Sequence, residues 1–385
     1  MNTKTDVKIA IVHDYIKEYG GAERVLEELA KIFPEADIYT SLYIPKFLGP
    51  HAKRFKHFKI HTSFLQRFPF KEKLISPFRL IAPLAFMSMN LSSYDAVIVS
   101  QTGAYFPNLI NKGHAKLICY THTPPRYLYG YMTARDWKSN KLKLVIGSIM
   151  NHFLRIFDFN SSKNVDQFIA NSKEVALRIK KFYRKDAVVI YPPVEIADDT
   201  KQIIKSQGKQ PDKEYYLTGG RLARAKGTDI IVNAFLKNKK PIKIFGKGFA
   251  GFEERLLSKA KGDGGKVNIE FLGEITDEEK LRLMENARAF IFASFDEDFG
   301  ITPVEAMGQG TPVIAYNSGG VQETVIDQKT GLLYAVNTPD CLNSAIDRFE
   351  KLNISKGACV TQAKKFSPST FDSKLKTLVL KTIYS

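Results

Sequence analysis

Short apolar runs alternate with segments of helical periodicity along almost the whole chain of 385 residues. Apolar runs such as Val7–His13 and Tyr94–Ser100 have the length of strands, and between Val25 and Phe33 the apolar residues recur at the spacing of one helix face. Alternation of strands and helices is typical of βαβ units, which place their strands side by side in a parallel sheet. The pattern therefore predicts an α/β fold made of doubly wound, Rossmann-like sheets.

The alternation is interrupted once, near the middle of the chain. Tyr191-Pro192-Pro193 ends the first series of strands, and residues 195–214 are polar without apolar periodicity. A second series then runs from Glu214–Thr218 to Leu332–Ala335. Sheets of this kind bind ligands at the carboxyl ends of their strands. We therefore predict two domains, residues 1–192 and 193–366, that face a ligand-binding cleft.

Basic residues are concentrated in the first half of the chain. The formal net charge is +17, and residues 1–190 carry 29 basic against 15 acidic side chains, whereas 191–385 carry 28 against 25. Residues 46–80 alone hold nine basic side chains against Glu72, with phenylalanines between them. This mixture can dock on anionic lipid, although a solvated basic surface or a nucleic-acid contact would use the same charges. We expect an anionic membrane surface as the partner of 46–80, and no nucleic acid.

A second candidate for a membrane contact is the apolar segment 138–157. It contains too many charges for a transmembrane span, and its pattern fits either a helix at the membrane interface or a helix buried in the first domain. The chain has no run of eighteen uncharged apolar residues, and its three cysteines are widely spaced. These features predict a cytoplasmic protein, peripheral at most on the inner face of the membrane.

Two glycine-rich turns follow expected strands in the second half. The turn Gly219–Gly227 contains Arg221 and Lys226, whose spacing allows both cations to face one diphosphate. A basic turn exposed to water is the alternative. The turn Gly246–Gly251, followed after about 20 residues by Glu270, is similar to a dinucleotide fingerprint. It is the basis for a second interpretation, a NAD-dependent oxidoreductase.

The densest set of polar residues lies at 295–310. Glu297 follows an expected strand and stands between two aspartates. Thr302, Pro303 and Glu305 have the spacing of a helix start with a capping box, which would by itself explain Glu305. A helix that starts there would also aim unpaired N–H groups at a phosphate. Cations, helix N-terminus and paired carboxylates together predict a nucleotide-sugar site.

These motifs resemble those of the retaining glycosyltransferases of family 4, which have the GT-B fold of two Rossmann-like domains facing a cleft. Glu297 and Glu305 form an E-x7-E pair, the Gly-Arg-Leu-x3-Lys-Gly turn is similar to the family's diphosphate clamp, and the family shares the Gly-x-Gly turn at Gly246. Segments of the first half that resemble the family and its mannosyltransferase-like branch are His13–Tyr15, Gly20–Arg24, Tyr120–Tyr127 and Ala170–Ser172.

The resemblance implies a role for each matching residue. Arg221 and Lys226 would neutralise the donor diphosphate as it leaves, and Glu305 would accept hydrogen bonds from the ribose hydroxyls. Glu297 would orient the donor sugar, and His122 would face the sugar near its anomeric carbon, unless it is a histidine satisfied by loop backbone. Further donor-binding contacts are expected at Gly20, Gly21, Gly246, Gly300, Ile301, Thr302, Gly319 and Gly320.

The resemblance also implies the activity. We expect a retaining glycosyltransferase that moves mannose from GDP-mannose to a glycan or lipid-linked acceptor during synthesis of cell-surface polysaccharide or glycoconjugate. No metal or other cofactor is expected, because the two cations and the helix dipole supply positive charge. The last segment, 367–385, would return to the first domain. The alternatives left open are a nucleotide-sugar epimerase on the same fold, the NAD-dependent oxidoreductase and a basic nucleic-acid-binding protein.

Overall fold

The computed structural model describes residues 7–133, 141–196, 214–248, 251–261 and 268–385. These residues divide into two compact units. Unit 1 comprises 7–131, 141–193 and 368–385, and unit 2 comprises 132–133 and the described residues of 194–367. The chain thus passes from unit 1 to unit 2 after Pro193, and most of the polar segment 195–214 lies outside the described residues.

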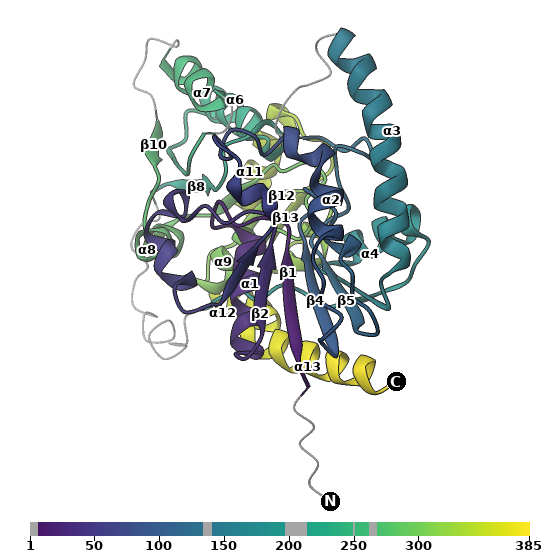
Figure 1. Cartoon of the computed structure of the whole chain (residues 1–385). Coiled ribbons are helices and arrows are strands. Elements are labelled where there is room, and N and C mark those ends of the chain that lie inside the picture. Colours follow the sequence, from purple (N-terminus) through teal and green to yellow (C-terminus); the bar gives the residue numbers. More distant parts are fainter. Residues whose placement is uncertain (1–6, 134–140, 197–213, 249–250, 262–267) are drawn as a thin grey trace, which may run out of the picture. The chain divides into compact units, whose positions relative to one another are not determined.

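Unit 1 is built on a seven-stranded parallel sheet in the order β3-β2-β1-β4-β5-β6-β7. The order reverses between β1 and β4, which is the point where a doubly wound sheet binds its ligand. Figure 1 shows β1 and β4 side by side. The strands are β1 (Ile9–His13), β2 (Asp37–Thr40), β3 (Ile60–Thr62), β4 (Ala96–Gln101), β5 (Lys116–Thr121), β6 (Gln167–Ala170) and β7 (Ala187–Val189).

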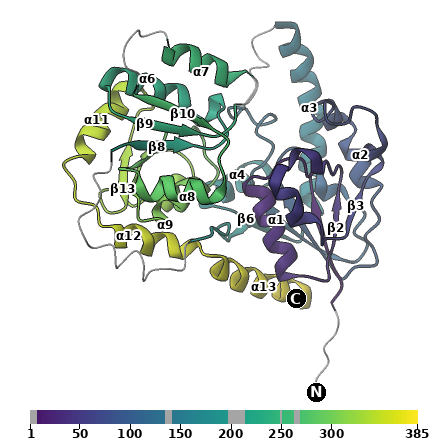
Figure 2. The same ribbon diagram turned by 90° about the vertical axis from the view of Figure 1, so that its left-hand side faces the viewer.

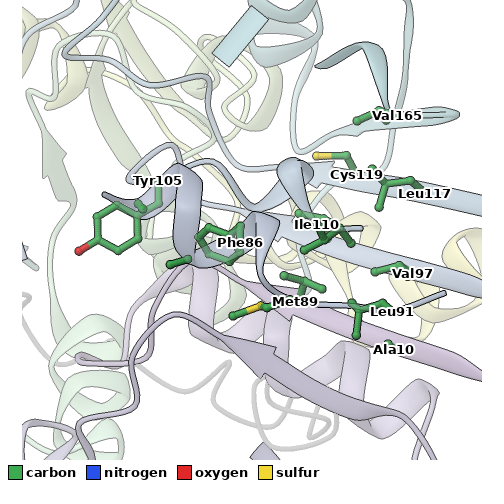
Figure 3. Packing of buried hydrophobic residues seen from close by; sticks show 14 of the residues in the cluster. Ala10, Phe86, Met89, Leu91, Val97, Tyr105, Ile110, Leu117, Cys119 and Val165 are labelled. Carbon is green, nitrogen blue, oxygen red and sulfur yellow. The ribbon is translucent and has the colours of Figure 1, made fainter. Parts of the chain in front are cut away.

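Helices cover both faces of this sheet. On one face, α1 (Gly21–Ile32) and α13 (Pro368–Tyr384) pack on a core that includes Ile11, and the rings of Tyr120 and Phe371 lie 5.8 Å apart. On the other face, α2 (Ala82–Met87) and α4 (Lys173–Tyr183) pack on a core that includes Val12. Figure 3 shows part of this second core. Ile11 and Val12 face opposite sides because side chains alternate along a strand.

Unit 2 is built on a six-stranded parallel sheet in the order β10-β9-β8-β11-β12-β13, with the same reversal between β8 and β11. In Figure 2, α6, α7 and α11 lie above this sheet and α8, α9 and α12 below it. The strands are β8 (Tyr216–Gly219), β9 (Ile242–Phe245), β10 (Ile269–Gly273), β11 (Phe290–Phe292), β12 (Val313–Tyr316) and β13 (Gly331–Tyr334). The helices are α6 (Thr228–Asn238), α7 (Phe252–Lys261), α8 (Asp277–Asn286), α9 (Ile301–Gly308), α10 (Val321–Thr324), α11 (Pro339–Phe349) and α12 (Lys356–Ala363).

The predicted fold class is confirmed, one strand was not expected, and one of the two interpretations of the segment 138–157 is wrong. Strand β3 lies inside the basic segment 46–80 and was not predicted, because Ile60-His61-Thr62 is too short to show alternation. Residues 141–157 of the apolar segment belong to α3 (Lys141–Lys163), and residues 138–140 lie outside the described residues. This helix is not buried, since Ile149 and Phe153 are 57% and 59% exposed. Among the described residues, no helix is long and apolar enough to cross a membrane.

Candidate active site

The turn after β8 lies beside the reversal point of the unit 2 sheet. It contains a short 3-10 helix, Arg224–Lys226, and ends at Gly227, which has φ 63° and precedes α6. A Cβ at Gly227 would lie 2.1 Å from the carbonyl oxygen of Ala293, which follows β11. Glycine at this position therefore lets the Lys226 turn pack directly against the segment that leads to Glu297.

Lys226 and Glu297 form an ion pair across this contact. Lys226 Nζ lies 2.6 Å from Glu297 Oε2, and Ser294 Oγ donates to the same oxygen at 2.5 Å. The side chain of Glu297 is 12% exposed, whereas that of Lys226 is 39% exposed. The carboxylate is thus held in place by two donors, while the side chain of Lys226 is partly exposed.

Gly319 and Gly320 support the loop that carries Glu297. Gly320 N–H donates to the carbonyl oxygen of Glu297 at 2.8 Å. A Cβ at Gly319 would lie 2.2 Å from that same oxygen, and one at Gly320 would lie 2.5 Å from the carbonyl oxygen of Asp298. Close backbone packing explains why both positions are glycine, and their contact with a donor stays a prediction.

The structure corrects the predicted start of the helix that carries Glu305. Helix α9 begins at Ile301 with Gly300 as its N-cap, so Thr302 lies inside the first turn and does not cap the helix. Glu305 is buried, and its Oε1 lies 2.9 Å from Nζ of Lys280 on α8. Lys280 Nζ also lies 3.1 Å from Asp277 Oδ1. The capping-box explanation of Glu305 is therefore wrong, and a buried ion pair between two helices takes its place.

The second glycine-rich turn, which begins at Gly246, packs directly against the first one at 219–227. Leu222 N–H donates to the carbonyl oxygen of Lys247 at 2.9 Å, and a Cβ at Gly246 would lie 1.8 Å from the carbonyl oxygen of Gly220. Arg221 is exposed in the first turn. Glu270, the ribose acid of the dinucleotide interpretation, is exposed and pairs with Lys243 of the neighbouring strand at 3.3 Å. Tight packing of the two turns thus accounts for Gly246, whereas a Cβ at Gly248 would lie 2.3 Å from Cβ of Glu253.

In unit 1, two histidines meet at the reversal point of the sheet. His13 ends β1, and its Nδ1 lies 3.0 Å from Oγ of Ser100 on β4. His122 follows β5, and its Nε2 lies 2.9 Å from the same Oγ. Ser100 has one proton to donate, so at least one of the two rings donates to its hydroxyl oxygen. The structure thus gives His122 a side-chain partner, and the loop backbone alone does not satisfy it.

His122 is uncharged near neutral pH. Burial, with a smaller contribution from the charge of His13, lowers the pKa of His122 from about 6.5 to about 3. A neutral imidazole can exchange a hydrogen bond with a sugar hydroxyl without carrying charge to the reacting centre.

The lowered pKa predicts a loss of stability in acid. Below pH 6.5 the unfolded chain binds a proton at residue 122 that the folded chain excludes, so the free energy of unfolding falls as the pH decreases toward 3. Between about pH 7.5 and pH 5, urea denaturation should show about 2 kcal/mol more loss for the natural protein than for His122→Asn. Equal losses in the two proteins would contradict the lowered pKa.

The loop before α1 is closed by internal contacts. Gly20 N–H donates to the Glu23 carboxylate at 2.9 Å, and Gly21 is the first residue of α1. The other carboxylate oxygen of Glu23 lies 3.7 Å from Nε2 of His13. A phosphate contact at Gly20, as predicted, would therefore have to displace Glu23.

Three polar residues of these sites were not assigned a role from the sequence. Ser100 links the histidines, Ser294 holds Glu297, and Lys280 holds Glu305. Asp14, noted only within a motif, accepts from the N–H groups of Thr102 and Ala104 at 3.1 and 3.0 Å. Each contact except Ser294–Glu297 joins residues far apart in the sequence. Ser294 and Glu297 are three residues apart in a loop, where this spacing does not indicate a contact.

Two family models match consecutive parts of the chain. "Glycosyltransferase Family 4" matches residues 19–198, and "Glycosyl transferases group 1" matches residues 199–366. The chain belongs to the family 4 glycosyltransferases. The oxidoreductase interpretation of the second glycine-rich turn is therefore wrong.

Relatives of this glycosyltransferase extend over its full length. It is 27% identical to alpha-1,3/1,6-mannosyltransferase ALG2 of Dictyostelium discoideum, with 98% of each chain covered. It is 25% identical to the ALG2 protein of Rhizomucor pusillus, with 98% of this chain and 92% of the relative covered.

Solved structures confirm the GT-B fold of this glycosyltransferase. Sucrose-phosphate synthase from Thermosynechococcus elongatus matches with a TM-score of 0.73 and 17% identity over 97% of this chain and 98% of that chain. HepE from Anabaena, in complex with UDP, matches with a TM-score of 0.69 and 18% identity over 97% of this chain and 100% of that chain.

Proposed function

We propose that this glycosyltransferase moves mannose from GDP-mannose to a hydroxyl of a glycan or lipid-linked acceptor, with retention of the anomeric configuration, in the synthesis of cell-surface polysaccharide or glycoconjugate. Full-length similarity to two proteins named alpha-1,3/1,6-mannosyltransferase supports the choice of sugar. The observation that carries the proposed chemistry is the ammonium group of the partly exposed Lys226 side chain, held 2.6 Å from the fixed carboxylate of Glu297.

In this proposal, unit 2 binds the donor. Lys226, together with the exposed Arg221, neutralises the diphosphate as the bond to the anomeric carbon breaks. Glu297 then accepts hydrogen bonds from the donor sugar, and Glu305 from the ribose. Lysine and arginine supply the positive charge that a divalent cation provides in other sites, so the proposal includes no metal.

The proposed transfer proceeds on one face of the sugar. The acceptor oxygen forms a bond to the anomeric carbon, the bond from that carbon to the diphosphate oxygen breaks, and the acceptor proton passes to the leaving diphosphate. Glu297 forms no covalent bond in this scheme, unlike the nucleophilic carboxylate of a retaining glycosidase. Oε2 of Glu297 already accepts from Lys226 and Ser294, which favours a positioning role.

A thermal-shift screen of GDP-, UDP- and ADP-sugars tests the donor. A ligand that binds only the native state at 100 times its Kd adds about 2.7 kcal/mol of stability, which corresponds to an increase in Tm of about 5–10 °C for a domain of this size. We expect GDP-mannose to give the largest increase. UDP-glucose deserves its place in the screen because the structurally similar HepE binds UDP. A larger increase with UDP- or ADP-sugars would contradict the proposed donor.

Incubation of the selected donor without acceptor separates the transferase from the epimerase alternative. A transferase leaves the sugar of the intact donor unchanged, apart from slow hydrolysis, whereas an epimerase converts it to its epimer. Sugar analysis by chromatography after complete acid hydrolysis distinguishes the two. Appearance of an epimer would contradict the proposed transfer.

A further inference from the structure

Exposed apolar side chains are concentrated in one part of unit 1. Of the nineteen large apolar side chains that are exposed in the described residues, thirteen lie between Phe47 and Phe157. Single exposed apolar residues are normal on a protein surface, but a concentration of them indicates a surface that binds something. The part of unit 1 that follows β2 and ends in α3 is therefore a candidate binding surface.

Helix α3 carries the most regular of these exposed sets. Val145, Ile149 and Phe153 recur at intervals of four residues, and they are 57%, 57% and 59% exposed. Leu154 and Asp158, by contrast, are buried, and Asp158 accepts hydrogen bonds from Tyr129 and Tyr183. Helix α3 is thus attached to unit 1 along one side while its opposite side stays apolar and exposed, as in helices that lie at a membrane interface.

A second exposed set lies on a neighbouring element. Leu80, Leu84 and Met87, on the 3-10 helix Pro77–Leu80 and on α2, are 48%, 60% and 53% exposed. Both views in Figures 1 and 2 place α2 close to α3, and both helices contact the turn Pro107–Leu109.

The segment around Tyr127 connects the two exposed sets. The guanidinium group of Arg79 lies 4.4 Å from the centre of the Tyr127 ring, and Asn151 Nδ2 donates to the carbonyl oxygen of Tyr127 at 3.3 Å. Arg155 also donates to the carbonyl oxygen of Leu128, at 3.2 Å. The two exposed sets are therefore joined through the segment around Tyr127 within unit 1.

The charges near these side chains are almost all positive. Helix α3 contains one acidic residue, Asp158, and it is buried, whereas Arg155 and Lys163 are exposed. Between Ile38 and Tyr94 the only acidic residue is Glu72. The exposed basic residues Arg67 and Lys73 lie close in the sequence to Leu65 and Leu74, which pack on the same core as α2. Lys53 and Lys56 instead flank Phe55 of the core on the other face of the sheet, and Lys59 pairs with Asp37 at 2.7 Å. A surface that combines apolar side chains with exposed cations complements anionic lipid, whose head groups attract each basic residue while the acyl chains accept the apolar ones.

We propose that the exposed apolar sides of α3 and α2, with the basic side chains of 64–80 that pack on the same core as α2, dock unit 1 on an anionic lipid bilayer. The contact is peripheral, with the apolar side chains entering the boundary between head groups and acyl chains. It extends the membrane contact expected for 46–80 to two helices, and it is independent of which sugar the enzyme transfers.

Vesicle binding by the full-length chain tests the proposal. Flotation with phosphatidylcholine vesicles that contain phosphatidylglycerol should bring the protein to the top of the gradient, and vesicles of phosphatidylcholine alone should bind much less. The double variant Ile149→Ser/Phe153→Ser should reduce partitioning to the anionic vesicles by about tenfold or more, because two apolar side chains no longer leave water. Replacing Arg67 and Lys73 with Gln should reduce it by a factor that decreases at high salt.

The matched control is Leu177→Ser/Val188→Ser. These two side chains are also exposed, by 67% and 42%, and also belong to unit 1, but lie on α4 and β7. They should leave vesicle binding unchanged. Since all four replaced side chains are exposed, each variant should keep the far-ultraviolet circular dichroism and the donor-induced increase in Tm.

Four outcomes would overturn the proposal. They are equal binding to neutral and anionic vesicles, equal losses in the α3 variant and its control, binding to duplex DNA in preference to vesicles, and a dimer in light scattering that the α3 variant abolishes while no vesicle binding is seen. Failure of the sugar-donor screen would leave these outcomes unaffected, so the two proposals fail separately.

Discussion

Lys226→Ala should reduce kcat by about 10²-fold or more, with a smaller change in the acceptor KM. The ammonium group would be lost where negative charge develops on the leaving diphosphate, and removing one such group typically costs two to three orders of magnitude. If the contact between Lys226 and Glu297 were only an exposed ion pair, its loss would cost at most about 1 kcal/mol of stability and leave turnover intact. Donor turnover and urea denaturation of the same variant distinguish the two cases.

Glu297→Gln provides a second test of the same pair. Gln removes a negative charge next to Lys226 Nζ and keeps a hydrogen-bonding side chain. If Lys226 binds the diphosphate, GDP affinity should rise or stay the same in Glu297→Gln and should fall in Lys226→Ala. Sugar transfer should fall in both, because Glu297 is proposed to orient the sugar. Calorimetric titration with the nucleoside diphosphate selected by the donor screen measures the affinities.

Lys237→Ala is the matched control for the loss of a lysine. Lys237 lies on α6 of the same unit and pairs with Asp340 at 2.8 Å, with its side chain 57% exposed. Its replacement removes an ion pair of similar length away from the glycine-rich turns. Turnover should therefore stay within about twofold of the natural enzyme. A similar loss in both lysine variants would point to a general effect of net charge and contradict the specific role of Lys226.

Most strands of both sheets could be predicted because the burial of a strand is visible in the hydrophobicity of its own residues. Strand β4 (Ala96–Gln101) is buried along its whole length, and its first four residues form an unbroken apolar run, as is typical of parallel sheets that are covered on both faces. Strand β3 was not predicted because its three residues have intermediate or exposed side chains and form no apolar run. Short edge strands are positioned by their neighbour, here β2, rather than by their own pattern.

The site residues that belong to local sequence motifs could be predicted, but the contacts between distant segments could not. Lys226 and Glu297 were both singled out from their motifs, a glycine-rich turn and an acidic loop that each follow an expected strand. The structure adds that these two strands, β8 and β11, lie side by side in the sheet. The direct contact between them depends on the close approach of Gly227 to Ala293, which no local pattern encodes. Thr302 and Glu305 illustrate the opposite case, since a sound local capping pattern was overridden by a Gly300 N-cap and by Lys280 from another helix.

The exposed side of α3 could not be predicted for a related reason. Its sequence is apolar over more than one side, so periodicity alone does not separate the side that packs from the side that remains exposed. The distinction comes from Asp158, whose burial against Tyr129 and Tyr183 fixes the helix orientation.

Glu305→Gln should lower the free energy of unfolding by about 3 kcal/mol. Glu305 and Lys280 are both buried, and removing one partner of a buried ion pair leaves the other charge without full compensation. Asp277, 3.1 Å from Lys280 Nζ, moderates the loss. Loss of a helix cap alone would cost about 1 kcal/mol. Urea denaturation of the natural protein and the variant gives this difference.

The same variant tests the proposed contact of Glu305 with the ribose when it is compared with Lys280→Met. Both variants break the ion pair, and both should be less stable, but only Glu305→Gln replaces the carboxylate that would accept from the ribose hydroxyls. Affinity for the nucleoside diphosphate, measured well below the Tm of each variant, should therefore fall about tenfold or more in Glu305→Gln, as expected for the loss of charge-assisted hydrogen bonds, and clearly less in Lys280→Met. Equal losses of affinity would mean that Glu305 acts only through the packing of α8 against α9, and the ribose contact would then be abandoned.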